Sequence, residues 1–358
     1  MPNFSEGRRD HVIDAVAQAA GASHVLDVDK DPDHHRAVIS IAGSRPRLIE
    51  ALVAMVGVAV DRIDLTAHSG VHPRVGAADV VPVVPLGGSS IEAARDIAHE
   101  VAERIWSELH VPVFYYGHGE GRRLADIRAG RATPDVGGPA LHPTAGAVSV
   151  GARQFLVAFN VILYGYDLVA ARALARSIRE SGDGLRGVQA LAFELPGNRI
   201  QLSMNLFRLD ETKPSDVLAQ LSRLGVSIGA EEVVGLSPAF AANGAATGRV
   251  LEGRLAAAGS ELAATKTERV GGLEHRALAV RLRETAFGLK RLAVDQDAIL
   301  AAAEQSAALV PVARAAGVLD EEIESLLLIA GRGLRAAISD STAAAYRARV
   351  DALDARLI

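Results

Sequence analysis

The stretch from residue 154 to residue 236 constrains the fold of this chain more than any other. Apolar runs of strand length alternate there with helical patterns, and Pro196-Gly197-Asn198 marks a hairpin. The expected elements are strands at 154–163, 185–194, 199–206 and 226–236, and helices at 167–181 and 214–224. Strand, helix, strand, strand, helix, strand is the ferredoxin-like order, which gives an antiparallel sheet with helices on one face.

The first 150 residues show a related alternation of apolar runs and helical patterns. We expect strands at 23–29, 36–42, 79–86 and 111–116, and helices at 10–20, 45–60, 89–109 and 122–129. Asp10 is expected to cap the first of these helices, and Ser89 or Ser90 the third. The sequence therefore predicts an α/β (α+β) fold with two ferredoxin-like subdomains side by side, although no sequence repeat links them.

From about residue 239 the composition shifts to alanine, arginine and glutamate, and strand patterns end. Amphipathic helices are expected at 249–264, 272–292, 295–316, 320–337 and 341–357. We interpret this region as an all-α C-terminal appendage that serves packing or dimerisation rather than catalysis. The expected domains are 1–150 and 151–240 for the two subdomains and 241–358 for the helices, and the expected assembly is a homodimer.

Composition and charge exclude several classes of protein. The net charge of -5 and the pI of about 6.1 give no basis for binding nucleic acid or an anionic membrane. The absence of cysteine excludes disulfides, thiolate catalysis and cysteine-bound zinc, and fits a reducing compartment. No apolar run approaches the roughly 20 residues that span a bilayer, and the polar start carries no secretory signal. We expect a soluble, cytoplasmic protein.

The loop HSGVHPRVGAAD at 68–79 is the segment richest in groups that can do chemistry. It is too rich in Gly and Pro for a helix and precedes an apolar strand, a setting in which catalytic groups are often presented. His72 taken alone is most often an exposed loop residue. Arg74 and the upstream Arg36 have two interpretations, because an arginine fork binds substrate carboxylates or pairs with a neighbouring Asp. Asp79, at the start of the strand, more often satisfies backbone donors.

Several motifs follow one another in a fixed order. The central one is HSGVHPRVGAADVVP at 68–82, and the others include PNFSEGR at 2–8, LDVDKDPDHHR at 26–36, RRLADIRAG at 122–130, GPALHPTAGAVSVGARQFLVAFNV at 138–161 and IRESGDGLRGVQAL at 178–191. In this order they resemble the formiminotransferases, the folate-dependent enzymes of histidine breakdown. The resemblance runs from residue 2 to about residue 238, roughly two-thirds of the chain.

The resemblance implies a fold, a reaction and a catalytic residue. The fold is two α/β subdomains with a folate-binding tunnel between them. The reaction moves a formimino (or formyl) group between N-formimino-glutamate and N5 of tetrahydrofolate, which is a co-substrate. His72 matches the family's general acid/base. N5 must lose a proton as it attacks and the leaving nitrogen must gain one, and a histidine with a pKa near 6.5 does both at physiological pH.

The other candidate binding residues fall in three groups besides Arg36, Arg74 and Asp79. Asp27 and Asp29 are expected at a strand end, where one of them orients the catalytic histidine, binds the pterin or caps a turn. Asn160 and Asn205 are expected mid-strand among apolar residues, where a buried amide bonds to a pterin edge or to the protein. The loop at 138–146 matches the family's folate-contacting segment, and its Gly and Pro content allows close approach to a flat ring. Its candidates are Gly138, Pro139, His142 and Gly146.

Three positions depart from the family pattern. The family usually has Glu where this chain has Val71, Asn where it has His35, and Glu where it has His118. These departures leave the donor and acceptor open. The alternatives are a divergent folate-dependent transferase or cyclising enzyme that acts on another amine, and a non-catalytic folate-binding protein.

The added histidines raise a metal site as a further alternative. Those in candidate loops are His34, His35, His68, His72, His118 and His142. Their spacing matches no recognised ligand pattern such as H-E-x-x-H, and no metal is expected. Nothing after residue 239 matches the P-G-G-G-S start of the cyclodeaminase domain in bifunctional family members, so that second activity is not assigned.

Overall fold

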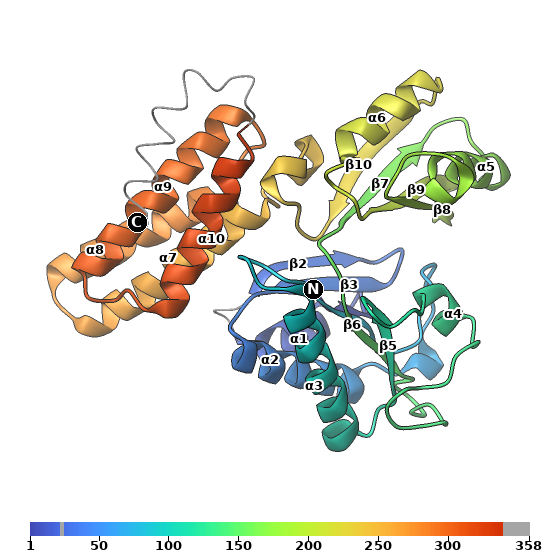
Figure 1. Ribbon diagram of the computed structural model, residues 1–358, viewed down its shortest axis with the longest axis horizontal. Coiled ribbons are helices and arrows are strands. Elements are labelled where there is room, and N and C mark those ends of the chain that lie inside the picture. Colours follow the sequence, from blue (N-terminus) through green and yellow to red (C-terminus); the bar gives the residue numbers. More distant parts are fainter. Residues whose placement is uncertain (22–24, 339–358) are drawn as a thin grey trace. The chain divides into compact units, whose positions relative to one another are not determined.

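A computed structural model describes residues 1–21 and 25–338 of the 358-residue chain. Within these residues the fold is mixed α/β, with a six-stranded sheet, a four-stranded sheet and a C-terminal run of four helices (Figure 1). The predicted fold class is confirmed. The helix predicted at 341–357, and the first residues of the strand predicted at 23–29, lie outside the described residues.

The six-stranded sheet has the order β2-β3-β1-β4-β6-β5. Its strands are β1 (Asn3–Phe4), β2 (Val25–Asp31), β3 (Arg36–Ile41), β4 (Ala78–Val83), β5 (Val113–Gly117) and β6 (Val148–Ala152). The associated helices are α1 (Asp10–Ala19), α2 (Arg45–Arg62), α3 (Ile91–Leu109) and the short α4 (Leu124–Arg128). The strands β1 to β4 with α1 and α2 reproduce the ferredoxin-like order, and β6 and β5 extend the sheet beyond β4 as parallel strands.

The sequence patterns do not predict two strands of this sheet, β1 and β6. β1 has two residues, too few to show any alternation. β6 has only five residues, VSVGA, and is buried along its whole length, so buried and exposed positions do not alternate in it, and its small residues do not form a pronounced apolar run. Both are interior strands, since β1 pairs with β3 and β4, and β6 pairs with β4 and β5. The periodicity of side chains along the sequence therefore does not predict these two interior strands.

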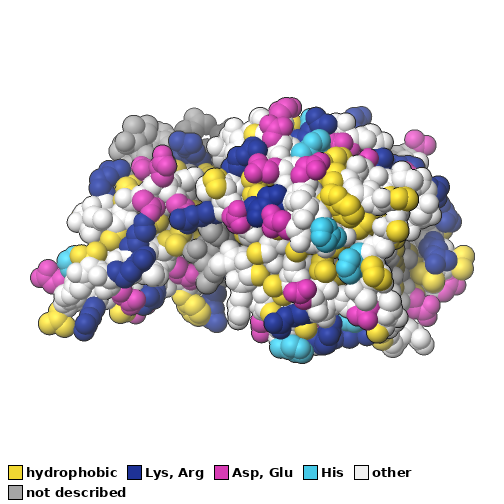
Figure 2. Space-filling view, turned by 90° about the horizontal axis from the view of Figure 1, so that it is seen from below, with side chains coloured by type: hydrophobic (Ala, Val, Ile, Leu, Met, Phe, Trp, Pro, Cys, Tyr) yellow, Lys and Arg dark blue, Asp and Glu magenta, His cyan; other side chains and the backbone are white. Residues whose placement is uncertain are grey.

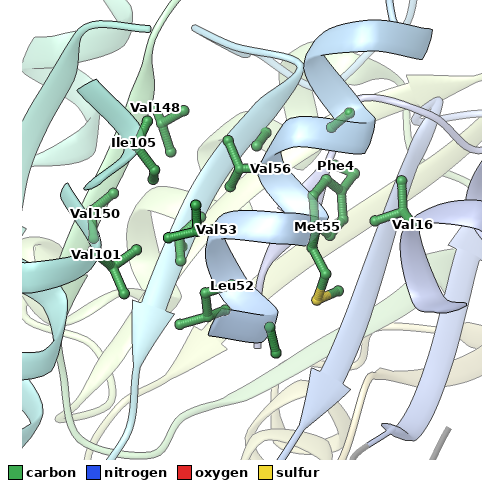
Figure 3. Close-up of a cluster of buried hydrophobic side chains, with 14 of the residues drawn as sticks. Phe4, Val16, Leu52, Val53, Met55, Val56, Val101, Ile105, Val148 and Val150 are labelled. Atoms are coloured by element: carbon green, nitrogen blue, oxygen red, sulfur yellow. The ribbon is translucent and has the colours of Figure 1, made fainter. Parts of the chain in front are cut away.

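One hydrophobic core lies between this sheet and helices α1, α2 and α3 (Figure 3). Leu52, Met55 and Val56 of α2 are at most 2 % exposed, and Phe4 of β1 lies beside Met55. Burying a side chain of this size contributes about 1.5–3 kcal/mol. Phe4 therefore anchors β1, and with it the neighbouring Asn3.

The helix starts agree only in part with the prediction. The prediction that Asp10 caps α1 is wrong, because Asp10 is the first helical residue and Arg9 is the N-cap. Asp10 instead accepts a hydrogen bond from Lys30 Nζ at 2.6 Å. The cap of α3 is confirmed, because Ser90 Oγ accepts from the Ala93 amide at 3.1 Å.

The four-stranded sheet has the order β10-β7-β9-β8. Its strands are β7 (Val157–Leu163), β8 (Val188–Leu195), β9 (Arg199–Leu206) and β10 (Ile228–Val234), with α5 (Leu168–Ile178) and α6 (Pro214–Arg223) between them along the chain. The ferredoxin-like order predicted from residues 154–236 is confirmed, with differences only at the ends of the elements.

The C-terminal helices are α7 (Leu251–Val270), α8 (Leu273–Lys290), α9 (Gln296–Ala315) and α10 (Glu321–Ala336). α7 packs against α8 and α10, and α9 packs against α10. Asp295 and Asp320 cap the last two helices by accepting from the amides of Ala298 and Ile323. Among the described helices, none combines the length and the apolar character that crossing a membrane requires.

The chain divides into two compact units. The first comprises Met1–Phe155, Tyr166–Ala171 and Ala192–Gln201, and the second Leu156–Gly165, Arg172–Leu191 and Leu202–Ile358. The predicted domain boundaries near 150 and 240 stay predictions.

Glu252, in the first turn of α7, is a buried carboxyl group. It is 6 % exposed, and its Oε2 accepts a hydrogen bond from the Ala239 amide at 2.8 Å. It lies against Gly333 of α10, where an added Cβ would come 2.5 Å from the Glu252 Cγ. Burial raises the pKa of Glu252 to about 7, although hydrogen bonds from the backbone act in the opposite direction.

The raised pKa of Glu252 predicts a loss of stability as the pH rises from about 4.5 to about 7. In this range the folded state keeps a proton that the unfolded state releases, so the unfolding free energy falls, by roughly 3 kcal/mol in total. Glu252→Gln keeps an acceptor for Ala239 and should remove this dependence. Thermal melts near pH 5 and near pH 8 measure it, and Glu261→Gln, at a half-exposed position of α7 where the carboxylate pairs with Lys290, is the control. A variant that gains no stability over wild type at the higher pH would contradict the prediction.

Candidate active site

The position of β1 between β3 and β4 brings three polar side chains together. Asn3 of β1 is in register with Val38 of β3 and Val80 of β4. Arg36 begins β3 and Asp79 is the second residue of β4. The Arg36 Nε and Nη2 donate to Asn3 Oδ1 at 3.1 and 2.9 Å, and its Nη1 donates to Asp79 Oδ2 at 2.8 Å. The pairing of three strands thus fixes the guanidinium group.

Asp79 is the buried anion of this cluster, with a side chain that is 0 % exposed. Its Oδ2 accepts from Arg36 and also from Arg128 Nη2 at 2.5 Å, and its Oδ1 accepts from the Val75 amide at 2.7 Å. Burial alone would raise the pKa of Asp79, but the charges of Arg36 and Arg128 outweigh it and hold that pKa below its ordinary value. Asp79 is therefore ionised, and it pairs with two cations as well as with a backbone donor.

His72 lies in the loop between a short 3-10 turn, Leu65–Ala67, and β4. Its Nδ1 is 2.9 Å from Arg36 Nη1 and 2.7 Å from the Pro73 carbonyl oxygen. Arg36 can only donate and the carbonyl can only accept, so the protonation of Nδ1 decides which contact is a hydrogen bond. The Nε2 of His72 forms no hydrogen bond within the described residues.

The surroundings of His72 strongly favour its neutral form. The pKa of His72 is lowered to about 2, mainly by burial and then by the charges of Arg36 and Arg128, while Asp79 acts in the opposite direction. The assumption of an ordinary pKa near 6.5, made from the sequence, is therefore wrong for the chain without ligand. His72 is neutral at physiological pH.

Arg74 holds the backbone of this loop together. Its Nη2 and Nε donate to the His72 carbonyl at 2.7 and 3.2 Å, and its Nη2 and Nη1 reach the carbonyls of His34 and His35 at 3.3 and 3.4 Å. Its Nη1 also lies 2.6 Å from the His68 ring. Because these acceptors take up the guanidinium donors, the geometry supports a structural role for Arg74 rather than the predicted binding of a substrate carboxylate.

Glu6 connects the N-terminal turn to the same loop. Its Oε1 accepts from the three amides of residues 7–9 at 2.9 to 3.0 Å and lies 3.0 Å from His35 Nε2. Burial acts to raise the pKa of Glu6, but these hydrogen bonds outweigh it and lower the pKa to about 2. His35 also bonds to the Ser69 carbonyl at 2.8 Å and stacks on the His68 ring at 3.9 Å. His35, a departure from the family pattern, thus bridges two segments of the site.

The loop at 138–146 packs against the residues that precede β4. Gly146 forms a bridge with Gly76, and the Ala147 amide donates to the Val75 carbonyl at 3.1 Å. His142 closes its own loop, since its amide donates to the Gly146 carbonyl at 2.8 Å. This predicted folate-contacting loop is therefore a direct neighbour of the His72 loop.

Gly76→Ala is expected to destabilise the protein by about 1–3 kcal/mol and to lower activity. A Cβ at Gly76 would lie 1.8 Å from the Ala147 carbonyl oxygen and 2.9 Å from that of Ala78, and neither backbone can yield without disturbing the sheet. Urea unfolding and turnover measure the effect. Gly288→Ala is the control, because Gly288 is at an exposed position of α8 with open space around it, and this variant should gain about 1 kcal/mol. A Gly76→Ala variant as stable as wild type would refute the steric argument.

The remaining predicted residues have mixed outcomes. Asp27 and Asp29 lie inside β2 rather than at a strand end, because the strand continues to Asp31. Both are buried. Gly138 and Pro139 are exposed and are joined by a cis peptide bond.

The two predicted asparagines belong to the second unit. Asn160 of β7 is 6 % exposed, and its Nδ2 donates to Glu232 Oε2 at 3.1 Å, on the neighbouring strand β10. This is a structural bond, and the contact of Asn160 with a pterin edge stays a prediction. The prediction that Asn205 is buried is wrong, because it alternates with the buried Met204 and Leu206 and faces outward.

Three residues of the cluster were not singled out by the sequence patterns. They are Asn3, Glu6 and Arg128. Their only signal is a place within the motifs PNFSEGR and RRLADIRAG, where the segments were interpreted as a turn and a short helix.

The histidines of this protein show no metal-binding arrangement in the part of the chain that the structure describes, where no group of three or more His, Asp or Glu residues could hold an ion. On the face shown in Figure 2, histidine side chains (cyan) reach the surface among both acidic and basic ones.

Comparisons with known proteins bear on this site. Residues 1–153 match the family model of the formiminotransferase domain, N-terminal subdomain. A glutamate formimidoyltransferase from Streptococcus pyogenes serotype M1 is 37 % identical over 269 residues, which are 67 % of this chain and 89 % of that protein. One from Thermoplasma acidophilum is 37 % identical over 265 residues, 66 % of this chain and 87 % of that protein. A formimidoyltransferase-cyclodeaminase from Rattus norvegicus is 34 % identical over 268 residues, 66 % of this chain but 49 % of that protein.

Proposed function

The chain belongs to the formiminotransferase family, and from this premise we propose that it moves a formimino group from N-formimino-glutamate to N5 of tetrahydrofolate, with His72 as acid and base. The observation that carries the proposal is the place of His72 beside the ion pair between Arg36 and Asp79. The Nδ1 of His72 contacts Arg36 and the Pro73 carbonyl, whereas its Nε2 forms no hydrogen bond within the described residues. Tetrahydrofolate is a co-substrate, and the reaction needs no metal.

The proposed chemistry uses one ring nitrogen for two proton transfers. N5 attacks the formimino carbon, the new N5–C bond forms, and the electron pair of the C=N bond moves to nitrogen. The proton of N5 passes to Nε2 of neutral His72. Nε2 then gives that proton to the glutamate nitrogen as the bond between it and the carbon breaks, and the electron pair on the imino nitrogen re-forms the C=N bond. The products are 5-formimino-tetrahydrofolate and glutamate, and acid–base catalysis of this kind contributes about 10²- to 10⁴-fold.

The contacts of His72 suit this role. For Nε2 to accept a proton, the hydrogen of the neutral ring must be on Nδ1, and the Pro73 carbonyl at 2.7 Å accepts it there. Asp79 offsets the charge of the imidazolium that forms, whereas Arg36 opposes it. The proposal therefore requires that bound substrates raise the pKa of His72.

A second candidate is transfer of a neutral formyl group. Val71, directly before His72 and 38 % exposed, stands where the family usually has Glu. A formimino group is an amidine and is cationic at neutral pH, so a carboxylate beside it is favourable. A formamide is neutral and does not require that charge, and an apolar residue at this position favours it.

Calorimetric titration with tetrahydrofolate, followed by addition of each donor with absorbance monitoring of the folate product, tests both candidates. Turnover with N-formimino-glutamate supports the first candidate, and turnover with N-formyl-glutamate alone supports the second. Folate binding without turnover of either donor would refute both as reactions of this chain. No folate binding at all would remove the basis of the proposal.

A further inference from the structure

Arg128 has hydrogen-bond donors that the described protein does not use. It ends α4, its side chain is 17 % exposed, and its Nη2 donates to Asp79 Oδ2 at 2.5 Å. Its Nε is buried and has no hydrogen-bond partner. A guanidinium group carries five N–H donors in a fork that matches a carboxylate. Arg128 is therefore able to bind a further anion next to Asp79.

The charge of the cluster also favours an added anion. Arg36 and Arg128 share a single carboxylate oxygen of Asp79, so two cations face one anion in a buried setting. Burial lowers the pKa of Arg36, and the charge of Arg128 lowers it further, which shows that the two guanidinium groups repel each other. A carboxylate bound between them would relieve this repulsion.

We propose that Arg128 binds the α-carboxylate of the donor amino acid beside Arg36, whose own donors are held by Asn3 and Asp79 and whose charge attracts the anion, and that the arrival of this carboxylate makes His72 a stronger base. This inference rests on the proposed function, in which the donor is an N-substituted glutamate. Arg128 then determines which donor the site binds. Binding of the donor in turn makes His72 a better proton acceptor.

Both substrates carry carboxylates, and the distance of each carboxylate from the reacting nitrogen decides which one can reach Arg128. Arg36 is in contact with His72, and His72 exchanges a proton with the donor nitrogen. The α-carboxylate is attached to the carbon that carries this nitrogen, so a group beside His72 reaches it. The glutamyl end of folate is at the far end of an elongated molecule from N5. The site therefore fits the donor's α-carboxylate rather than the folate tail.

Electrostatics predicts how the bound carboxylate changes the protonation of His72. The charged and titratable groups around His72 are Arg36 of β3, Asp79 of β4, Arg128 of α4 and His34 of the turn after β2. Arg74 of the same loop adds a further positive charge, because it donates to the His72 carbonyl. Their sum disfavours the imidazolium, and one added negative charge opposes that effect. His72 thus stays unprotonated until a donor binds, and only then takes a proton readily.

A pair of stable analogues isolates the α-carboxylate. N-acetyl-glutamate carries it, and 4-acetamidobutanoate is the same molecule without it. Calorimetry gives their Kd values for the full chain, and the ¹³Cε1 resonance of His72, assigned by its loss in His72→Gln, reports protonation. We expect N-acetyl-glutamate to bind about tenfold or more tightly than 4-acetamidobutanoate. It alone should raise the titration midpoint of His72, by about one to three pH units.

Variants of α4 and its N-cap test the role of Arg128. Arg128→Gln should lose the preference for N-acetyl-glutamate and should raise the His72 midpoint without ligand. Arg128→Lys keeps the charge without the fork, so the midpoint without ligand should stay near that of wild type while the preference weakens, which keeps the test valid if the Gln variant does not fold. Arg123→Gln removes an arginine whose side chain is 80 % exposed. This variant should keep the wild-type preference for N-acetyl-glutamate and the wild-type His72 midpoint.

Three outcomes would overturn the inference. They are a full preference for N-acetyl-glutamate in Arg128→Gln and Arg128→Lys, an unmoved His72 midpoint in the wild-type complex, and displacement of N-acetyl-glutamate by 5-formyl-tetrahydrofolate that depends on Arg128. The last would assign the site to the folate tail. None of these measurements needs turnover. Arg128-dependent binding in a chain that transfers no group would refute the proposed function alone, and transfer without any such dependence would refute the inference alone.

Discussion

His72→Ala should reduce kcat by about 10²- to 10⁴-fold and leave tetrahydrofolate binding close to that of wild type. The reason is that His72 offers the ring nitrogen that is unengaged beside the ion pair. Arg36 keeps its bonds to Asn3 and Asp79 without the imidazole, so the variant should fold normally. Steady-state absorbance assays give kcat and KM, and calorimetry gives the folate Kd.

His118→Ala is the matched control for this experiment. His118 also lies in a loop of the first unit, but it is exposed and its ring lies 3.6 Å from Glu92. It should retain wild-type kcat. If His72→Ala keeps more than about a tenth of kcat, the acid/base is another group. If folate binding disappears together with kcat, His72 is a binding residue instead.

Asp79→Asn is expected to cost about 3–5 kcal/mol of unfolding free energy, because it leaves two largely buried guanidinium groups without their anion. The carboxylate is fully buried and accepts from Arg36, Arg128 and the Val75 amide, and an amide of the same shape cannot supply the missing charge. Urea unfolding measures the change, and activity should fall with it because Arg36 loses its orientation.

Asp126→Asn provides the comparison, because Asp126 also pairs with two arginines but at the surface of the short α4. Exposed pairs contribute little to stability, so this variant should unfold at nearly the same urea concentration as wild type. An Asp79→Asn variant that loses less than about 1 kcal/mol would mean that the buried arginines find other partners.

The sequence predicts this fold well where periodicity is strong. Helix and strand order between residues 154 and 236 is right because amphipathic helices there alternate with apolar strands separated by turn residues. It fails for β1 and β6, whose pairing depends on strands far away in the chain. Nothing in two residues, Asn3 and Phe4, indicates a strand until β3 and β4 are present on either side.

The candidate site also contains residues that local sequence patterns indicate and residues that only the fold brings together. Sequence reasoning singles out His72 in its Gly- and Pro-rich loop, and Arg36 and Asp79 at the starts of their strands. Arg128 is one of many arginines in an Ala- and Arg-rich chain, and only the fold places it on Asp79. The low pKa of His72 likewise depends on burial and on neighbours that are distant in sequence.

The central place of β1 has a consequence for how the protein is made. Residues 3 and 4 leave the ribosome before the two strands with which they pair, which begin at residues 36 and 78. The sheet cannot close until these later segments emerge, and such non-local pairing slows folding. Since Asn3 holds Arg36, a nascent chain in which β1 has not yet inserted has no ordered guanidinium beside His72. Completion of the sheet and assembly of the site are therefore one event, and activity reports the correct insertion of the N-terminal segment.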